Sequence, residues 1–347
     1  MKPRDPWGGL AGAEPVGRAD AFVLGLPYDG SACWRQGAAE APVRLREISA
    51  SSPAVSEDGF AVDPTSFRVV DLGDVAPRAA DLAEEIGDAA RRDYFSRVER
   101  AALDVLQPEG RPPGGFLLSI GGDHAVTIPL FRAFGRAFGE PVPPDRGIAG
   151  GVGLVVLDAH PDLFDTYDGS PLSNACPVRR ALETGKLRPE HLLLLGTRSY
   201  NPEELDFIQR ARITFVPARE LDHRGVDAAV ALARERLSGV RDVYLSLDID
   251  VADPACAPGT GAPVAGGLSS RQLLDLTRGL LEALPVRAMD IVEIAPPLDP
   301  TEATLFLGLQ LAFETFAVVA RKRIGVAPPS RPPFLAGPEA GSGVAEK

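Results

Sequence analysis

Short apolar runs recur along most of the chain, and segments with helical spacing separate them. The runs are Ala21–Pro27, Phe67–Leu72, Phe116–Ile120, Val152–Leu157, His191–Leu195, Thr214–Val216, Val243–Leu247 and Val286–Val292. They show little alternation between apolar and polar positions, which is typical of strands that are buried on both faces. The pattern therefore predicts eight buried strands.

The segments between these runs have the spacing of amphipathic helices. They are Ala80–Leu106, Val126–Phe138, Val178–Thr184, Pro202–Arg212, Val226–Leu237, Ser269–Ala283 and Thr301–Lys322. Alternating strands and helices predict an α/β protein whose strands pair in parallel through right-handed crossovers. The alternation alone fits either an open sheet between two helical layers or a closed (β/α)8 barrel.

The composition shows no break that would separate two domains. We expect one catalytic domain over residues 21–325, after an N-terminal extension of residues 1–20. Residues 326–347 are rich in Pro, Gly, Ser and Ala and lack a helical period, so we expect a mobile C-terminal tail there.

Targeting signals are not evident in this sequence. The first 20 residues lack the apolar core of a signal peptide. Thr304–Ala320 is apolar, but Gln310 and Glu314 interrupt it, so we interpret it as a buried helix rather than a membrane span. The cytoplasm is the expected location.

The charge and the cysteines exclude several classes of protein. Asp and Glu number 48 and Lys and Arg 36, which gives a formal net charge of −12. An acidic chain is a poor partner for nucleic acid or for an anionic membrane surface, since both require clustered positive charge. The three cysteines form no CxxC pair, which argues against a disulfide framework and against a thiolate zinc site.

Clusters of polar residues follow three of the predicted strands. They are His124 after a Gly-Gly turn, then Asp158, His160 and Asp162, and finally Asp248 and Asp250 after Ser246. Residues two apart in an extended chain share a face. Buried carboxylates that share a face repel each other and lose their hydration, and a divalent cation offsets both costs. A single aspartate after a strand is more often a helix cap, but a cap does not explain all three clusters.

Together these residues form a predicted metal site with four carboxylates and two imidazoles. That is too many ligands for one tetrahedral zinc ion. It suits two ions that share bridging carboxylates, and oxygen ligands favour manganese or a similar ion. Two ions roughly 3.5–4 Å apart can acidify a shared water to hydroxide.

The same segments resemble three signatures of the ureohydrolase family, which includes arginase and agmatinase. The matching segments are Gly121-Gly-Asp-His124, Asp158-Ala-His-Pro-Asp162 and Ser246-Leu-Asp-Ile-Asp-Val-Ala-Asp-Pro254. Gly25–Asp29, Ala257–Leu268 and Asp290–Pro296 extend the likeness, which covers roughly residues 20 to 322.

This resemblance implies a three-layer α/β/α fold with an eight-stranded parallel sheet. It also implies two manganese ions per subunit, although another divalent ion such as nickel would fit. His124 and Asp162 would bind one ion, His160 and Asp250 the other, and Asp158 and Asp248 would bridge them. A bridging hydroxide would attack the carbon of a small cationic guanidino substrate and release urea and an amine. Glu293 would orient the guanidinium. Family members often form trimers or hexamers, so a homo-oligomer is expected.

Two positions depart from the family pattern. Asn174 stands where the family usually has a histidine that helps to protonate the leaving amine, and an amide does no acid–base work near neutral pH. Asn201 stands where arginases hold the substrate's α-amino group with an acid, which disfavours L-arginine. Asn174 and Asn201 are therefore candidate substrate contacts. Agmatine, a guanidino acid and a specialised guanidino metabolite all stay open as substrates.

Three functions follow from this pattern. The first is a dimanganese amidinohydrolase of agmatinase-like type, with Glu293, Asn174 and Asp162 as catalytic candidates. The second is a weakly catalytic or non-catalytic protein that binds metal and a guanidinium ligand, as the change to Asn174 suggests. The third is a hydrolase that acts on a formimino compound or another C–N bond on the same scaffold.

Overall fold

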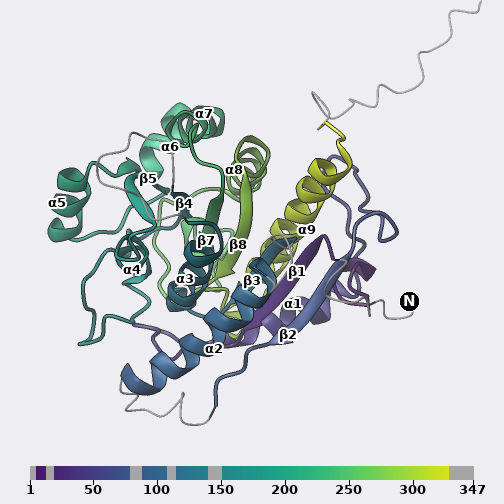
Figure 1. The fold of residues 1–347 in the computed structure, drawn as a ribbon, viewed down its shortest axis with the longest axis horizontal. Coiled ribbons are helices and arrows are strands. Elements are labelled where there is room, and N and C mark those ends of the chain that lie inside the picture. Colours follow the sequence, from purple (N-terminus) through teal and green to yellow (C-terminus); the bar gives the residue numbers. More distant parts are fainter. Residues whose placement is uncertain (1–4, 13–18, 79–87, 108–114, 140–150, 328–347) are drawn as a thin grey trace, which may run out of the picture.

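The protein is represented by a computed structural model. It describes residues 5–12, 19–78, 88–107, 115–139 and 151–327 (Figure 1). The predicted C-terminal tail therefore lies outside the described residues, except for Val326 and Ala327.

Eight parallel strands form one open sheet in the order β2-β1-β3-β8-β7-β4-β5-β6. Their bounds are β1 (Ala21–Leu26), β2 (Val69–Asp74), β3 (Phe116–Gly121), β4 (Val152–Leu157), β5 (Leu187–Leu195), β6 (Thr214–Val216), β7 (Val243–Asp248) and β8 (Val286–Val292). Every predicted run forms a strand. Because β2 and β6 stand at opposite ends of this order and do not pair with each other, the sheet does not close into a barrel.

Helices cover both faces of the sheet. Their bounds are α1 (Ala41–Ser49), α2 (Asp88–Leu106), α3 (Thr127–Phe138), α4 (Pro177–Leu182), α5 (Pro202–Ala211), α6 (Ala218–Arg224), α7 (Val226–Arg236), α8 (Ser270–Ala283) and α9 (Ala303–Ile324). Buried side chains of α1, α7, α8 and α9 form one core, and those of α2, α3 and α4 form the other. The predicted three-layer α/β/α fold is confirmed.

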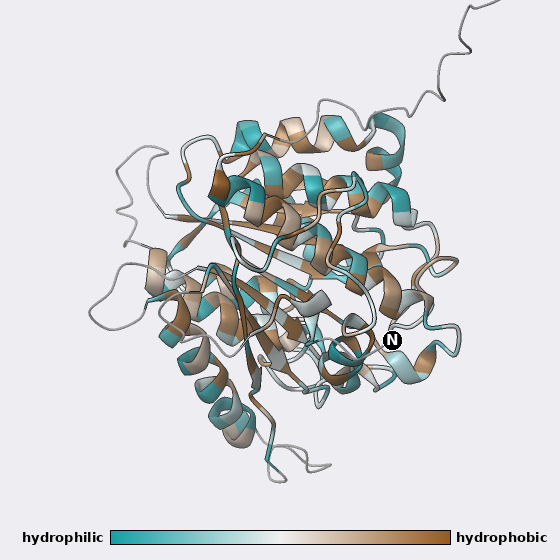
Figure 2. Cartoon of the chain, turned by 90° about the vertical axis from the view of Figure 1, so that its right-hand side faces the viewer, coloured by the Kyte–Doolittle hydropathy of each residue, from teal (hydrophilic) through white to brown (hydrophobic). Residues whose placement is uncertain are grey.

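Alternating side chains of each strand enter the two cores. In β1, Val23 packs into one core while Phe22 and Leu24 pack into the other. Figure 2 shows hydrophobic colour along the strands and hydrophilic colour on the outer helical surfaces. This burial on both faces explains why the strands lack alternation in the sequence.

Helix α9 is long and apolar enough to cross a membrane by composition, but most of it is buried inside the fold. It packs against α1 and α8, as expected for a core helix. Trp7 of the predicted N-terminal extension is also fully buried, and its Nε1 donates a 2.7 Å hydrogen bond to Asp71 Oδ2. Part of the extension therefore packs onto the domain.

Candidate metal centre and active-site pocket

Four strands that are neighbours in the sheet carry the candidate site at their carboxyl ends. In the order β3-β8-β7-β4 they lead to His124, Glu293, the Asp248–Asp250 segment and the Asp158–Asp162 segment. Because carboxyl ends of parallel strands lie at one edge, residues up to 169 positions apart in sequence meet there. The topology thus brings the predicted clusters together.

Tight backbone geometry holds these segments in place. A Cβ atom on Gly122 would lie only 1.8 Å from the carbonyl oxygen of Tyr28, so this position of the turn before His124 requires glycine. Asp162 and Glu293 have positive φ angles of 52° and 62°. Such angles are uncommon in non-glycine residues and concentrate at functional sites.

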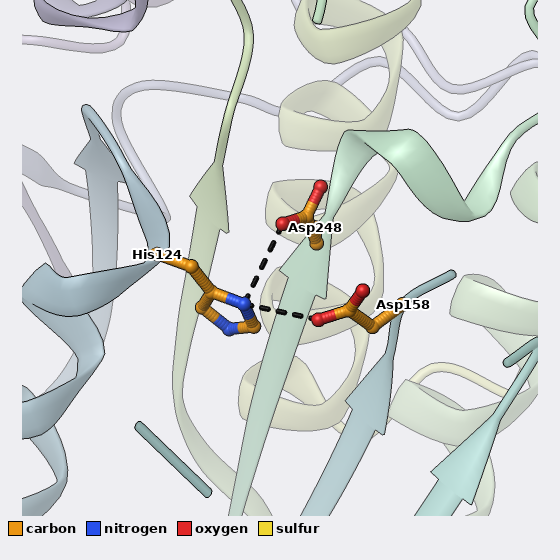
Figure 3. A group of neighbouring side chains, drawn as sticks. All are labelled: His124, Asp158 and Asp248. Carbon is orange, nitrogen blue, oxygen red and sulfur yellow. Dashed lines mark ion pairs between the residues drawn. The ribbon is translucent and has the colours of Figure 1, made fainter. Parts of the chain in front are cut away.

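The carboxylates surround the two histidine rings. His124 Nδ1 lies 2.8 Å from Asp162 Oδ2, 3.0 Å from Asp158 Oδ2 and 3.5 Å from Asp248 Oδ2. Figure 3 shows His124 facing Asp158 and Asp248. His160 Nδ1 lies 2.9 Å from Asp250 Oδ2 and 3.5 Å from Asp158 Oδ1. Asp158 therefore presents one oxygen to each histidine.

Two groups of ligand atoms emerge, and they share one carboxylate. The groups are His124, Asp158 and Asp248, and Asp158, His160 and Asp250, each with its ligand atoms within 4.8 Å of one another. Among the described residues, neither His124 Nδ1 nor Asp158 Oδ2 has a hydrogen-bond partner, although both are buried. Unpaired buried polar atoms of this kind fit a divalent cation.

The cluster perturbs the pKa values of its members. Burial alone would lower the pKa of His124, but the close contacts with Asp158 and Asp162 and their negative charge raise it well above its usual value. Burial, together with the charges of Asp250 and Asp158, raises the pKa of Asp248 well above its usual value. A bound cation would relieve both effects by replacing the proton between the rings and the carboxylates.

Glu293 is a further buried carboxylate of the site. Its Oε1 accepts a 2.8 Å hydrogen bond from the backbone N–H of His124. Burial and the charge of Asp123 raise the pKa of Glu293 to about 8. A cationic substrate would lower this pKa and restore the carboxylate.

A pocket with a volume of about 250 Å³ opens above the cluster. His124, His160, Asp162, Asp248, Asp250 and Glu293 line it. Asn174 and Asn201 also line it, as their positions in the sequence predict. Asn174 Nδ2 lies 3.7 Å from the sulfur of Cys33. The other two histidines are not among the lining residues, so neither His191 nor His223 replaces the missing imidazole.

The sequence patterns did not identify several residues of the pocket wall. Cys33, Trp34 and Arg35 reach the pocket from the loop after β1. Asp123 positions this loop, because its Oδ2 accepts hydrogen bonds from the backbone N–H and the hydroxyl of Ser31 at 2.8 and 2.7 Å. Asp123 could have been identified from the sequence, because it belongs to the Gly-Gly-Asp-His motif. Nothing in the sequence indicated that the loop after β1 reaches the pocket.

Comparison with known proteins agrees with this fold. The model of the arginase family matches residues 19–317. The chain belongs to the arginase family. The prediction of an arginase-family hydrolase is therefore confirmed.

Individual relatives of this arginase-family chain differ in their named substrates. It is 36% identical over 301 residues to a guanidinopropionase of Pseudomonas aeruginosa, with 86% of each chain covered. It is 33% identical over 311 residues to an agmatinase of Escherichia coli, with 88% of this chain and 89% of the relative covered. The structure of proclavaminate amidino hydrolase from Streptomyces clavuligerus superposes with a TM-score of 0.76 and 29% identity, over 91% of this chain and 97% of that one.

Proposed function

We propose that this protein is a two-metal amidinohydrolase that cleaves a small guanidino compound to urea and an amine. The observation that carries the proposal is the pair of ligand groups that share Asp158 and whose other members line the pocket. Two divalent cations bound there would acidify a shared water so that it acts as a nucleophile near neutral pH.

The distances support the predicted division of the ligands. His124 lies beside Asp162, and His160 lies beside Asp250. Asp158 faces both histidines, as a bridging ligand would, and Asp248 also faces His124. The oxygen-rich set favours manganese, although nickel would fit.

The protein's own residues would orient the substrate and accept protons. Glu293 is placed to pair with the planar guanidinium, because Oε1 is already held by the His124 backbone and Oε2 has no partner within the described part of the chain. Asp162 lines the pocket, and its Oδ2 faces His124. Its Oδ1 would accept a hydrogen bond from the attacking water. Asn174 would bind and orient the substrate without transferring a proton.

The charges of the pocket wall favour a guanidino acid over agmatine. The lining carboxylates outside the ligand set are Glu293 and Glu204, and Glu204 already accepts hydrogen bonds from the backbone N–H groups of Leu163 and Asn201. No free acid among the described lining residues could pair with a distal ammonium. Arg35 is the only Lys or Arg in that lining.

Arg35 is suited to bind a carboxylate. Its Nε and Nη2 donate to the carbonyl oxygens of Gly261 and Thr260 at 3.1 and 2.8 Å, which fixes the orientation of the guanidinium. Its Nη1 has no hydrogen-bond partner, and no carboxylate pairs with Arg35, within the described residues. The 36% identity to a guanidinopropionase supports the same substrate class.

A panel of guanidino compounds tests this function. Purified protein loaded with manganese should release urea from 3-guanidinopropionate or 4-guanidinobutyrate at a higher kcat/KM than from agmatine or L-arginine. A preference for agmatine would contradict the role of Arg35. If formimino compounds give formamide while no guanidino compound gives urea, the alternative C–N hydrolase is correct. Binding of metal and ligand without turnover of any compound would favour the non-catalytic alternative, which Asn174 suggests.

The cytoplasmic location and the trimeric or hexameric assembly stay predictions.

A further inference from the structure

A chain of buried hydrogen bonds runs from His124 away from the pocket. His124 Nε2 lies 3.0 Å from Ser246 Oγ, and Ser246 Oγ donates a 2.7 Å hydrogen bond to Asp290 Oδ1. The three side chains that these hydrogen bonds link are buried, and those of Ser246 and Asp290 are fully inaccessible to solvent. Asp290 thus contacts a candidate metal ligand through one intervening hydroxyl.

The sheet itself fixes this contact. Ser246 in β7 and Asp290 in β8 are direct partners in the parallel register. Their side chains therefore emerge side by side on the same face of the sheet. Because β8 lies between β7 and β3, Asp290 is positioned beneath the turn that follows β3 and carries His124.

The hydroxyl groups around Asp290 determine the direction of the hydrogen bonds. Tyr244 Oη and Thr127 Oγ1 donate to Asp290 Oδ2 at 2.7 and 2.8 Å. No Lys, Arg or His pairs with Asp290 within the described residues, so the three hydroxyl donors offset the cost of burying this carboxylate. Ser246 has a single hydroxyl proton, which it donates to Asp290. Its oxygen can therefore only accept from His124 Nε2.

We propose that Asp290, acting through Ser246, is a positioning residue that keeps the proton of neutral His124 on Nε2 and leaves the Nδ1 lone pair for a metal ion. This inference rests on the metal centre of the proposed function. It assigns Asp290 the task that carboxylates perform when they orient metal-binding histidines, here with a serine between the two.

The substitution Asp290→Asn should reverse the direction of the hydrogen bonds that link residue 290, Ser246 and His124. The amide that it introduces can donate to Ser246 Oγ, which frees the Ser246 proton to point at His124 Nε2. The proton of the imidazole would then be favoured on Nδ1, where it competes with the metal ion. Ser246→Ala removes the acceptor altogether and should have a similar effect.

A purely structural role for Asp290 makes a different prediction. Asp290 also joins Thr127 of α3 to the sheet, so its loss could simply loosen that contact. Tyr244→Phe is the matched control, because it removes a hydrogen bond from Asp290 Oδ2 and leaves the Ser246 branch intact.

Calorimetric titration of the metal-free protein with manganese, without substrate, tests the proposal. D290N and S246A should each weaken at least one binding step by about 10–100-fold, and Y244F by about threefold or less. Equal losses in D290N and Y244F, or unchanged affinity in D290N, would overturn it. No substrate is present in this titration, so its result does not depend on whether the protein releases urea. A failure of this inference can therefore be distinguished from a failure of the proposed function.

Histidine-selective nitrogen NMR provides a second test that needs no variant. The chain contains four histidines, so the spectrum is simple to assign. In wild-type protein loaded with diamagnetic zinc, the proton of His124 should reside on Nε2. A proton on Nδ1 would overturn the proposal even if D290N and S246A fail to fold.

Discussion

The backbone N–H of His124 donates a 2.8 Å hydrogen bond to Oε1 of Glu293. In return, the backbone N–H of Glu293 donates a 2.8 Å hydrogen bond to the carbonyl oxygen of Gly122. These two bonds fix the candidate guanidinium-binding carboxylate relative to the candidate metal centre. Fixed geometry of this kind favours catalysis, because the nucleophile and the substrate must meet at a defined distance.

Replacing Glu293 by glutamine should weaken substrate binding. The amide oxygen can still accept from His124, but the charge that pairs with a guanidinium is lost, so kcat/KM should fall about 10–100-fold. Steady-state urea release measures this, with Glu203→Gln as the control, since Glu203 is exposed and does not line the pocket. An unchanged kcat/KM in Glu293→Gln would contradict the role of this residue.

Replacing Asp158 or Asp248 by alanine should remove at least one metal ion. Asp158 faces both histidines, and Asp248 faces His124. Elemental analysis after dialysis gives the number of ions per chain. Asp206→Ala is a suitable control, because Asp206 is exposed, pairs with Arg210 and lies outside the pocket lining. Full metal content in the Asp158 variant would refute its bridging role.

Replacing Asn174 by histidine should introduce a new ionisation into the pH profile of kcat. An imidazole at this position would titrate near pH 6.5, whereas an amide does not titrate. Asn174→Ala should lower kcat by less than the factor of about 10²–10⁴ that a general acid typically contributes. Profiles of kcat from pH 6 to pH 9 test both expectations. A larger loss in Asn174→Ala would show that the amide is more than a binding group.

Acid should destabilise the fold through Asp58. Arg321 donates a 2.8 Å hydrogen bond to Asp58 Oδ1 and forms an ion pair at 2.7 Å with Asp58 Oδ2, and these contacts lower the pKa of Asp58 to about 2 from its usual 3.8. A folded-state pKa below the unfolded one stabilises the protein above pH 4, and this stability is lost as the pH falls from 4 towards 2. The shift corresponds to about 2 kcal/mol.

The variant Asp58→Asn isolates this contribution. Urea unfolding of the metal-free protein should show a deficit of about 2 kcal/mol at pH 7 that shrinks below pH 4. Metal-free protein is used so that loss of metal at low pH does not add to the effect. A deficit that stays constant down to pH 3 would mean that the charge of Asp58 is not its source.

The main features of the fold and the candidate metal ligands could be predicted because they depend on strands. Buried parallel strands have a plain apolar signal, and the clusters that follow β3, β4 and β7 meet for reasons of topology alone. Helices α1 and α6 were not predicted. Both are short, and α6 buries only Ala218 and Leu221, so their apolar signal is weak.

The pocket wall and the residues behind the ligands required the structure. Arg35 reaches the pocket through hydrogen bonds to carbonyl oxygens more than 220 residues away, which no local pattern encodes. Asp290 offered one signal, an acid inside an apolar strand. Ser246 shares the spacing of Asp248 and Asp250, yet it lies behind His124 instead of joining the carboxylates. Spacing defines a face of a strand, but neighbouring strands decide what that face contacts.

Titration of the metal-free enzyme with manganese, followed by urea release, tests the central claim most directly. We predict that urea release from a guanidino acid rises with added manganese and saturates at two ions per chain, with one amine formed for each urea. Urea release that is unaffected by metal, saturation at one ion, or no urea from any guanidino compound would contradict the two-metal amidinohydrolase.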